Sequence, residues 1–178
     1  MDLTIELLDA EAAVRHQRAL AELLEDAVDN GASIGFLPPM APGEADAYWR
    51  TVVAAIRAGS RVLVVARDAG GALVGTAQLD LCTRPNGRHR AEAMKVIVHT
   101  RARRRGIGRA LMLALEDEAR RRGLTTLVLD TRHGDHAERL YAGVGYTLAG
   151  VVPAYARSVG GELDPSAFYY KLLEGGTT

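Results

Sequence analysis

Hydrophobic positions at the start of the chain recur at helical spacing and then give way to a loop. A short strand is expected around Ile5 and Leu7, and apolar residues then return every three or four positions from residue 9 to residue 30. That period predicts one long amphipathic helix ending at Asn30-Gly31. A loop with apolar side chains, Phe36 to Met40, precedes a second helix expected between residues 43 and 59.

The middle of the chain changes to the pattern of β-strands. Val- and Leu-rich runs from 61 to 66 and from 73 to 81 flank the turn Asp68-Ala69-Gly70-Gly71, which predicts an antiparallel hairpin. A third strand is expected from Arg90 to Val98. A helical stripe follows from 108 to 122, closed by Gly123, and then a buried strand from 124 to 130. This order forms a βαβ unit, so its two strands should be parallel.

The last part of the chain is predicted less completely. A helix is expected from 135 to 143, a strand from 146 to 151 and a final strand from 167 to 173, whereas Pro153 to Pro165 fits no element. The whole pattern predicts a single domain over residues 1–178 of the α/β (α+β) class. Its mixed sheet should hold about seven strands, with an antiparallel N-terminal part, one parallel pair and about four helices.

Composition indicates an ordinary globular domain. Of the 178 residues, 48% are hydrophobic and 25% are charged, which excludes a wholly disordered chain. Cys82 is the only cysteine, so no intramolecular disulfide can form. The longest apolar runs fall far below the roughly 20 residues of a membrane span, and the first residues lack a signal-peptide pattern. We therefore expect a cytoplasmic protein without a membrane partner, either a monomer or a homodimer.

Charge is distributed unevenly, although the formal net charge is zero. Residues 1–60 carry four arginines against ten acidic residues, whereas residues 61–123 carry fourteen basic residues against six acidic ones. A basic centre within a neutral chain favours a local anionic ligand over a surface that coats nucleic acid.

The basic centre contains a glycine loop between the third strand and the long helix, Arg101-Ala102-Arg103-Arg104-Arg105-Gly106-Ile107-Gly108-Arg109-Ala110. Its glycines let backbone N–H groups approach a common point, and the following helix adds its positive N-terminal end. The loop therefore predicts a site for a phosphate-bearing cofactor, a diphosphate above all. A plain turn and a nucleic-acid contact are the alternatives. A Walker loop is excluded because Gly-Lys-Ser/Thr is missing, and a Rossmann loop would need glycine at Leu111.

Several segments in this order carry a family resemblance. They are the strand Val96-Ile97-Val98, the loop pattern Arg103-x-x-Gly106-x-Gly108, and Ala137-Glu138-Arg139-Leu140-Tyr141 followed by Gly145-Tyr146. Together they resemble the GCN5-related N-acetyltransferase (GNAT) family over most of the chain. Further residues look closest to its tabtoxin-resistance type: Phe36, His89-Arg90-Ala91-Glu92, Leu129-Asp130-Thr131 and Tyr169-Tyr170-Lys171.

The resemblance implies an acetyl-CoA-dependent transferase with the GNAT fold, in which the two parallel strands splay apart around the cofactor. It places the pyrophosphate on the loop backbone and the pantetheine beside the third strand. Gly134 departs from the family pattern, which often has an asparagine there that touches the cofactor arm. The implied cofactor-binding residues are Val96, Ile97, Val98, Arg103, Arg104, Arg105, Gly106, Ile107, Gly108, Arg109 and Ala110.

Direct acetyl transfer needs a base, an oxyanion-binding donor and an acid. Tyr141 aligns with the family's tyrosine, whose hydroxyl can protonate the departing sulfur; the alternative is an aromatic side chain that fills the interface between helix and sheet. A backbone N–H near Val98 is the expected oxyanion donor.

Two carboxylates compete for the role of base. Alternation along the third strand predicts that Glu92 shares a face with Met94, Val96 and Val98, where burial would favour its protonated form. Asp130 ends the second parallel strand, where ligands gather in open α/β sheets. A salt bridge for Glu92 and a helix cap for Asp130 are the structural alternatives.

These residues predict transfer of an acetyl group to a small polar acceptor, an amine or a hydroxyl, for which an amino-acid-like toxin or antibiotic is the candidate. The acidic N-terminal part, with Phe36, Leu37 and Met40, favours a cationic or zwitterionic molecule. A non-catalytic protein that binds acyl-CoA or a toxin is the alternative. No metal is expected, because His133 and His136 lack a third ligand pattern.

Overall fold

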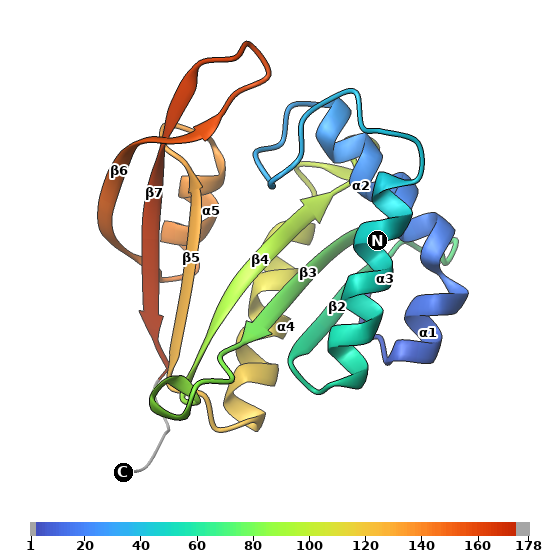
Figure 1. Ribbon diagram of the computed structural model, residues 1–178. Helices are drawn as coiled ribbons and strands as arrows, with labels where there is room; N and C mark the ends of the chain where they lie inside the picture. Colours follow the sequence, from blue (N-terminus) through green and yellow to red (C-terminus); the bar gives the residue numbers. More distant parts are fainter. Residues whose placement is uncertain (1–2, 174–178) are drawn as a thin grey trace.

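A seven-stranded mixed sheet forms the centre of the computed structural model, which describes residues 3–173 (Figure 1). The strands lie in the order β1-β2-β3-β4-β5-β7-β6, and only the neighbours β4 and β5 run parallel. The strands are β1 (Thr4–Leu7), β2 (Arg61–Arg67), β3 (Leu73–Leu81), β4 (Arg90–Val98), β5 (Thr126–Arg132), β6 (Thr147–Arg157) and β7 (Leu163–Leu172). The α-helices are α1 (Ala10–Arg15), α2 (Gln17–Asp29), α3 (Glu44–Arg57), α4 (Ile107–Arg121) and α5 (Ala137–Gly143). The predicted class and the parallel pair are confirmed.

The long N-terminal helix predicted from the sequence is two helices, so the prediction of about four helices falls one short. The chain leaves the helical conformation at His16, which ends α1 and precedes α2. The His16 imidazole Nε2 lies 2.8 Å from a guanidinium nitrogen of Arg67 at the end of β2. The break lets the two helices take different directions over the sheet, which hydrophobic spacing alone could not indicate.

The unassigned segment from Pro153 to Pro165 belongs to the β6–β7 hairpin. Strand β6 continues to Arg157, and β7 begins at Leu163. The register shifts between Val152 and Ala156, where Ala154 has a positive φ of 51°. Nearly every residue of β6 is exposed, since it is an edge strand with no layer over it. Pro153, which has no backbone N–H, and this register shift interrupt the strand pattern, which explains why the second half of β6 was not predicted.

Helices cover both faces of the sheet and create two cores. On one face, α4 and α5 pack against β2–β5 and β7, with Leu111, Leu115 and Tyr141 among the buried residues. On the other face, α1, α2 and α3 pack against β2, with Leu24 and Trp49 fully buried. No helix within residues 3–173 is both long enough and apolar enough to cross a membrane.

Strands β4 and β5 separate soon after they meet. Their pairing extends only from Arg90 opposite Thr126 to Glu92 opposite Val128, and the strands then diverge (Figure 1). On its other side β4 carries a bulge, because its register with β3 shifts between Met94 and Ile97. The backbone of β4 beyond Glu92 therefore has no strand partner toward β5, and the expected splay is confirmed.

Candidate functional site

The turn from β4 into α4 leaves the N-terminus of that helix open. Gly106 is the N-cap residue, with a φ of 78°, and no side chain caps the first turn. A Cβ added to Gly106 would meet no atom within 4 Å, so the space in front of it is free. Unpaired backbone N–H groups at a helix N-terminus attract anions. The loop therefore fits the phosphate-bearing cofactor expected from the sequence.

An acidic residue on another helix holds this loop in place. One carboxylate oxygen of Asp26, on α2, accepts a hydrogen bond from the Thr100 backbone N–H at 2.9 Å, and the other accepts one from the Thr100 hydroxyl at 2.7 Å. The His99 Nδ1 lies 3.4 Å from the same carboxylate. This contact could not be predicted from the sequence, because 74 residues separate Asp26 from Thr100.

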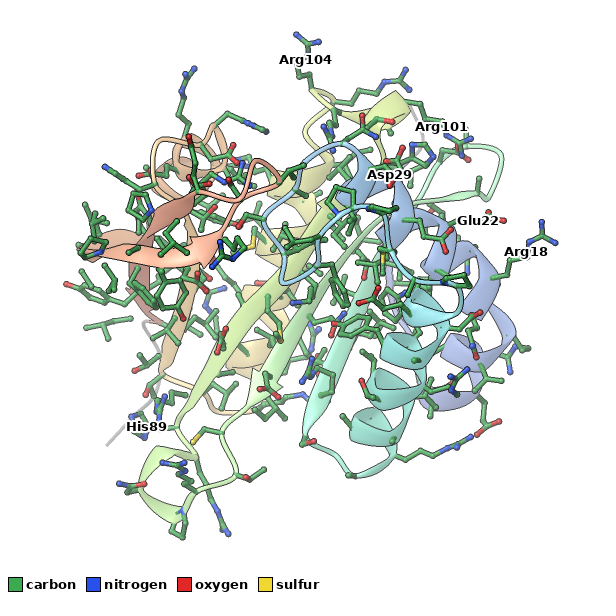
Figure 2. The ribbon with its side chains drawn as sticks, turned by 45° about the horizontal axis from the view of Figure 1, so that its top comes forward. Arg18, Glu22, Asp29, His89, Arg101 and Arg104 are labelled. Atoms are coloured by element: carbon green, nitrogen blue, oxygen red, sulfur yellow. The ribbon has the colours of Figure 1, made fainter. Side chains whose placement is uncertain are left out.

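The arginines of the loop do not all point the same way. Arg103 turns back, and its Nε donates a hydrogen bond to the Val98 carbonyl at 3.2 Å. Arg104 and Arg105 are exposed, and Figure 2 shows Arg101 and Arg104 directed away from the body of the protein. Backbone N–H groups are thus better placed than the arginine side chains to hold a phosphate.

Gly108 also has a packing role. A Cβ added there would lie 3.1 Å from the Leu140 Cδ2 on α5 and 3.9 Å from the Val98 Cγ2. Glycine at this position therefore permits close contact between α4 and α5, independently of any ligand. A bulky substitution at Gly108 would disturb that contact together with the cofactor loop.

Tyr141 lies on α5 within a cluster of three tyrosines. Its ring centre is 6.2 Å from those of Tyr146 and Tyr169. Burial raises the pKa of the Tyr141 hydroxyl well above its usual range, and the negative charges of Asp130 and Asp135 raise it further. The hydroxyl is therefore held in its protonated form, as a proton donor requires.

The charge of Asp130 acts on Glu92 near the opening between β4 and β5. Burial raises the pKa of the Glu92 carboxyl above its ordinary value, and the charges of Asp130 and Asp80 add to that shift. The Asp130 carboxylate accepts a hydrogen bond from the Ser166 hydroxyl at 2.7 Å. Because the charge of Asp130 also acts on Tyr141, the structure brings the three predicted catalytic residues into one electrostatic neighbourhood.

The expected face of Glu92 is wrong in part. Val96 and Val98 pack with the core on the α4 side, whereas Ile97 packs with the core on the α2 and α3 side. The bulge after Met94 adds one residue to β4 and reverses the alternation of its side chains. Glu92 therefore shares its face with Ile97, and not with the two valines.

Other charged residues near Glu92 were not predicted as site residues. The Arg61 guanidinium pairs with Asp80 at 3.0 Å and also donates to the Gln78 side-chain oxygen at 2.8 Å. Lys95 lies at the bulge of β4 with a positive φ of 51°. The one feature of the sequence that distinguishes Lys95 is its residue type, since lysine occurs only twice among the 22 basic residues of the chain.

The histidine pair has local acidic partners. The His133 Nδ1 lies 3.1 Å from Glu138, and the His136 Nδ1 lies 2.5 Å from Asp135. Within the part of the chain that the structure describes, no group of three or more His, Cys, Asp and Glu residues could hold a metal ion.

A cavity of about 640 Å³ lies away from this site, between the end of α4 and the β6–β7 pair. Its cations Arg120 and Lys171 both contact the buried carboxylate of Glu116, at 3.3 and 2.7 Å. Their charge is therefore already matched, and the predicted chemistry does not involve this cavity.

Comparisons with known proteins agree with this arrangement. A model of the acetyltransferase (GNAT) family matches residues 36–146. An uncharacterized N-acetyltransferase from the hisH-hisA intergenic region of Azospirillum brasilense is 34% identical over 134 residues, which cover 74% of this chain and 76% of that protein.

Two solved structures share the fold. The yncA protein of Salmonella typhimurium, solved with its cofactor acetyl-CoA, has a TM-score of 0.82 and 23% identity, covering 100% of this chain and 98% of its own. A phosphinothricin acetyltransferase of Sinorhizobium meliloti, in complex with AcCoA, has a TM-score of 0.81 and 23% identity, covering 99% and 91%.

Proposed function

Because the chain belongs to the acetyltransferase (GNAT) family and acts with acetyl-CoA as donor, we propose that it transfers the acetyl group to the amine of a small polar acceptor by direct attack. The observation that carries this proposal is the opening between β4 and β5, which begins after Glu92 and leads to the uncapped end of α4. When bound, acetyl-CoA supplies the acetyl group as an activated thioester.

Two groups of the chain would hold the donor. The backbone N–H groups from Arg103 to Ala110 face the phosphates, and the free backbone edge of β4 from Val96 to Val98 hydrogen-bonds the pantetheine arm. The open space at Gly106 and the missing strand partner of β4 support this assignment.

Three side chains would move protons. Glu92 accepts a proton from the acceptor amine, because its raised pKa makes it a stronger base than an ordinary carboxylate. Tyr141 keeps its hydroxyl proton until it donates it to the sulfur. Burial is the main cause of both pKa shifts, and the charge of Asp130 adds to each; Asp130 is also the alternative base.

The segments around the opening favour a small acceptor over a long peptide. The loop from residue 31 to 42 and the β6–β7 hairpin reach the same end of the sheet (Figure 1). Arg132, at the end of β5, links them: one guanidinium nitrogen lies 3.4 Å from the Gly31 carbonyl and another lies 3.0 Å from Asp164. An amino-acid-like toxin or antibiotic fits this enclosure, and a neighbour in fold is named a phosphinothricin acetyltransferase. A reducing cytoplasm suits the single free cysteine, Cys82.

The proposal is tested by measuring the release of free CoA from acetyl-CoA. Amines, amino acids, antibiotics and peptides are compared as acceptors. We expect small amines or amino acids to turn over faster than any peptide. Faster turnover of peptides would contradict the choice of acceptor. Binding of acetyl-CoA without CoA release for every compound would favour the alternative of a non-catalytic binding protein.

A further inference from the structure

Lys95 occupies a strained backbone position at the edge of the proposed site. It is the residue at the β4 bulge, and its φ of 51° lies in a region that residues other than glycine rarely adopt. Such strain costs about 1–3 kcal/mol and persists where the surrounding structure fixes it, often at functional sites. The bulge turns Lys95 to the side of β4 opposite Val96 and Val98, since those two pack with the core on the α4 side.

Two aromatic rings and a glycine surround the ammonium group. The Lys95 Nζ lies 5.8 Å from the ring centre of Phe36 and 5.7 Å from that of Tyr48. The two rings meet edge to face at 5.3 Å. A Cβ on Gly35 would lie 3.6 Å from the same Nζ. The loop before α3 and the start of that helix therefore hold the ammonium group at one place beside β4.

Lys95 has no ion-pair partner among residues 3–173, unlike two other partly buried cations of the sheet. Arg61 on β2 pairs with Asp80 at 3.0 Å, and Lys171 on β7 pairs with Glu116 at 2.7 Å. A partly buried cation without a counter-ion is costly unless another group neutralises it. Its aromatic neighbours offset part of that cost but bring no negative charge.

The charges near Lys95 match those of a zwitterion. Burial and the charge of Arg61 lower the pKa of Lys95, while the carboxylates of Glu92 and Asp130 raise it. The opening thus presents Lys95, a cation without an ion-pair partner, together with two carboxylates. Among the residues that the structure describes, the Asp130 carboxylate is hydrogen-bonded only by the neutral hydroxyl of Ser166. An amine is attracted to the carboxylates, and a negatively charged group of the same molecule is attracted to Lys95.

We propose that Lys95 binds a carboxylate that the acceptor carries beside its amine, so that the acceptor is an amino acid. This inference rests on the proposed acetyl transfer and makes Lys95 a residue that determines acceptor specificity. The ammonium donates hydrogen bonds to the acceptor carboxylate, which holds the amine of the same molecule toward Glu92.

The test compares Lys95→Met and Lys95→Arg with the unchanged protein. Methionine is unbranched and of similar length, so it keeps the contacts with the two rings and adds no strain at the positive φ. Arginine restores the charge. The acceptors are the proteinogenic L-amino acids, each paired with its carboxamide, at saturating acetyl-CoA. The ratio of variant to unchanged protein for each acceptor cancels the difference in amine pKa between an amino acid and its amide.

We expect Lys95→Met to raise KM for the amino acids about 10- to 100-fold, the range for a lost hydrogen bond to a charged group. At a pH well above the pKa of Glu92, it should leave their kcat, the KM for acetyl-CoA and all constants for the carboxamides nearly unchanged. The loss of activity at low pH should begin at a higher pH in this variant, because the charge of Lys95 lowers the pKa of Glu92. Lys95→Arg should recover most of the loss. An equal loss for acids and amides, or unchanged protein without a preference for acids, overturns the inference. A fall in kcat at that pH with acids and amides alike would instead make Lys95 a base and also overturn it.

Failure of the proposed function would be seen separately, as absence of CoA release with every acceptor. Binding then decides the inference through thermal shifts with the same amino acids and amides in the presence of CoA. A shift with the acids that is absent from Lys95→Met supports it. No shift with any acid, or equal shifts with acid and amide, rejects it.

Discussion

Tyr141 and Glu92 show how the surroundings of a single residue set its chemistry. Tyr141 is buried and Glu92 is half-buried, which keeps the tyrosine protonated and makes the carboxylate more basic. The motif around Tyr141 made it a candidate from the sequence. The face of Glu92 and the position of Lys95 could not be predicted, because one inserted residue in β4 reverses the alternation of side chains without changing the hydrophobic pattern.

Replacing Tyr141 by phenylalanine removes the proposed acid and keeps the ring that packs against Tyr146 and Tyr169. We expect turnover to fall by roughly 10²–10⁴, the usual contribution of one acid–base group, with acetyl-CoA affinity unchanged. Steady-state CoA release and a binding titration measure the two effects. Tyr146→Phe is the matched control, since the Tyr146 hydroxyl is buried without a partner, and it should retain activity. Equal activity of Tyr141→Phe and that control would limit Tyr141 to packing.

The pH profile separates the two candidate bases. Glu92 must be deprotonated to act, so kcat/KM should fall as the pH drops through its raised pKa. Glu92→Gln should abolish this limb and leave only the titration of the acceptor amine. Asp130→Asn should move the limb to lower pH, because it removes a negative charge that raises the pKa of Glu92. If the limb disappears in Asp130→Asn and only shifts in Glu92→Gln, the roles are reversed.

At the scale of secondary-structure elements, the cofactor loop depends on a helix far away in the sequence. Asp26→Ala removes both hydrogen bonds from α2 to Thr100. We expect weaker acetyl-CoA binding, by about 10-fold or more in Kd, since one or two hydrogen bonds to a charged group are lost. Calorimetric titration measures it. Asp29→Ala on the same helix is the control, because Asp29 is exposed (Figure 2). The same Kd in both variants would show that the loop holds its shape without α2.

Elements with buried side chains were predicted well, whereas irregularities within elements were not. The strands Leu73–Leu81 and Arg90–Val98 have the bounds expected from the sequence, since turn residues flank both of them. The break at His16 and the register shift after Val152 interrupt an element without a clear change in its hydrophobic spacing. Hydrophobic spacing reports which side chains are buried, and it does not locate such interruptions.

At the scale of the whole molecule, the opening divides the sheet into two parts that share a short ladder. Strands β1–β4 and strands β5–β7 are paired only from Arg90 to Glu92, and α4 packs behind the junction. A donor bound between β4 and β5 contacts both parts and binds only the folded chain. We expect acetyl-CoA at a hundred times its Kd to stabilise the fold by about 2.7 kcal/mol, which is about 5–10 °C in Tm.

A thermal melt with and without acetyl-CoA measures this stabilisation. Duplex DNA at the same ionic strength should leave the melt unchanged, because the arginines of the loop do not all point the same way and the chain is neutral overall. An unchanged melt with acetyl-CoA would contradict the proposed donor site. A shift with DNA that disappears at high salt would favour the nucleic-acid alternative.

The exposed outer strand has a consequence for how copies of the protein meet in concentrated solution. Natural sheets usually guard such an edge with charged side chains, but β6 carries none from Thr147 to Ala156. Its protection is a matter of shape: Pro153 offers no N–H, and the bend between Val152 and Ala156 interrupts any straight ladder. A bend in the backbone and a missing N–H group do not change with protonation or with counter-ions. Self-association along this edge should therefore hardly depend on pH or salt. Replacing Pro153 would straighten the strand, and we expect that change to promote self-association of the protein through β6.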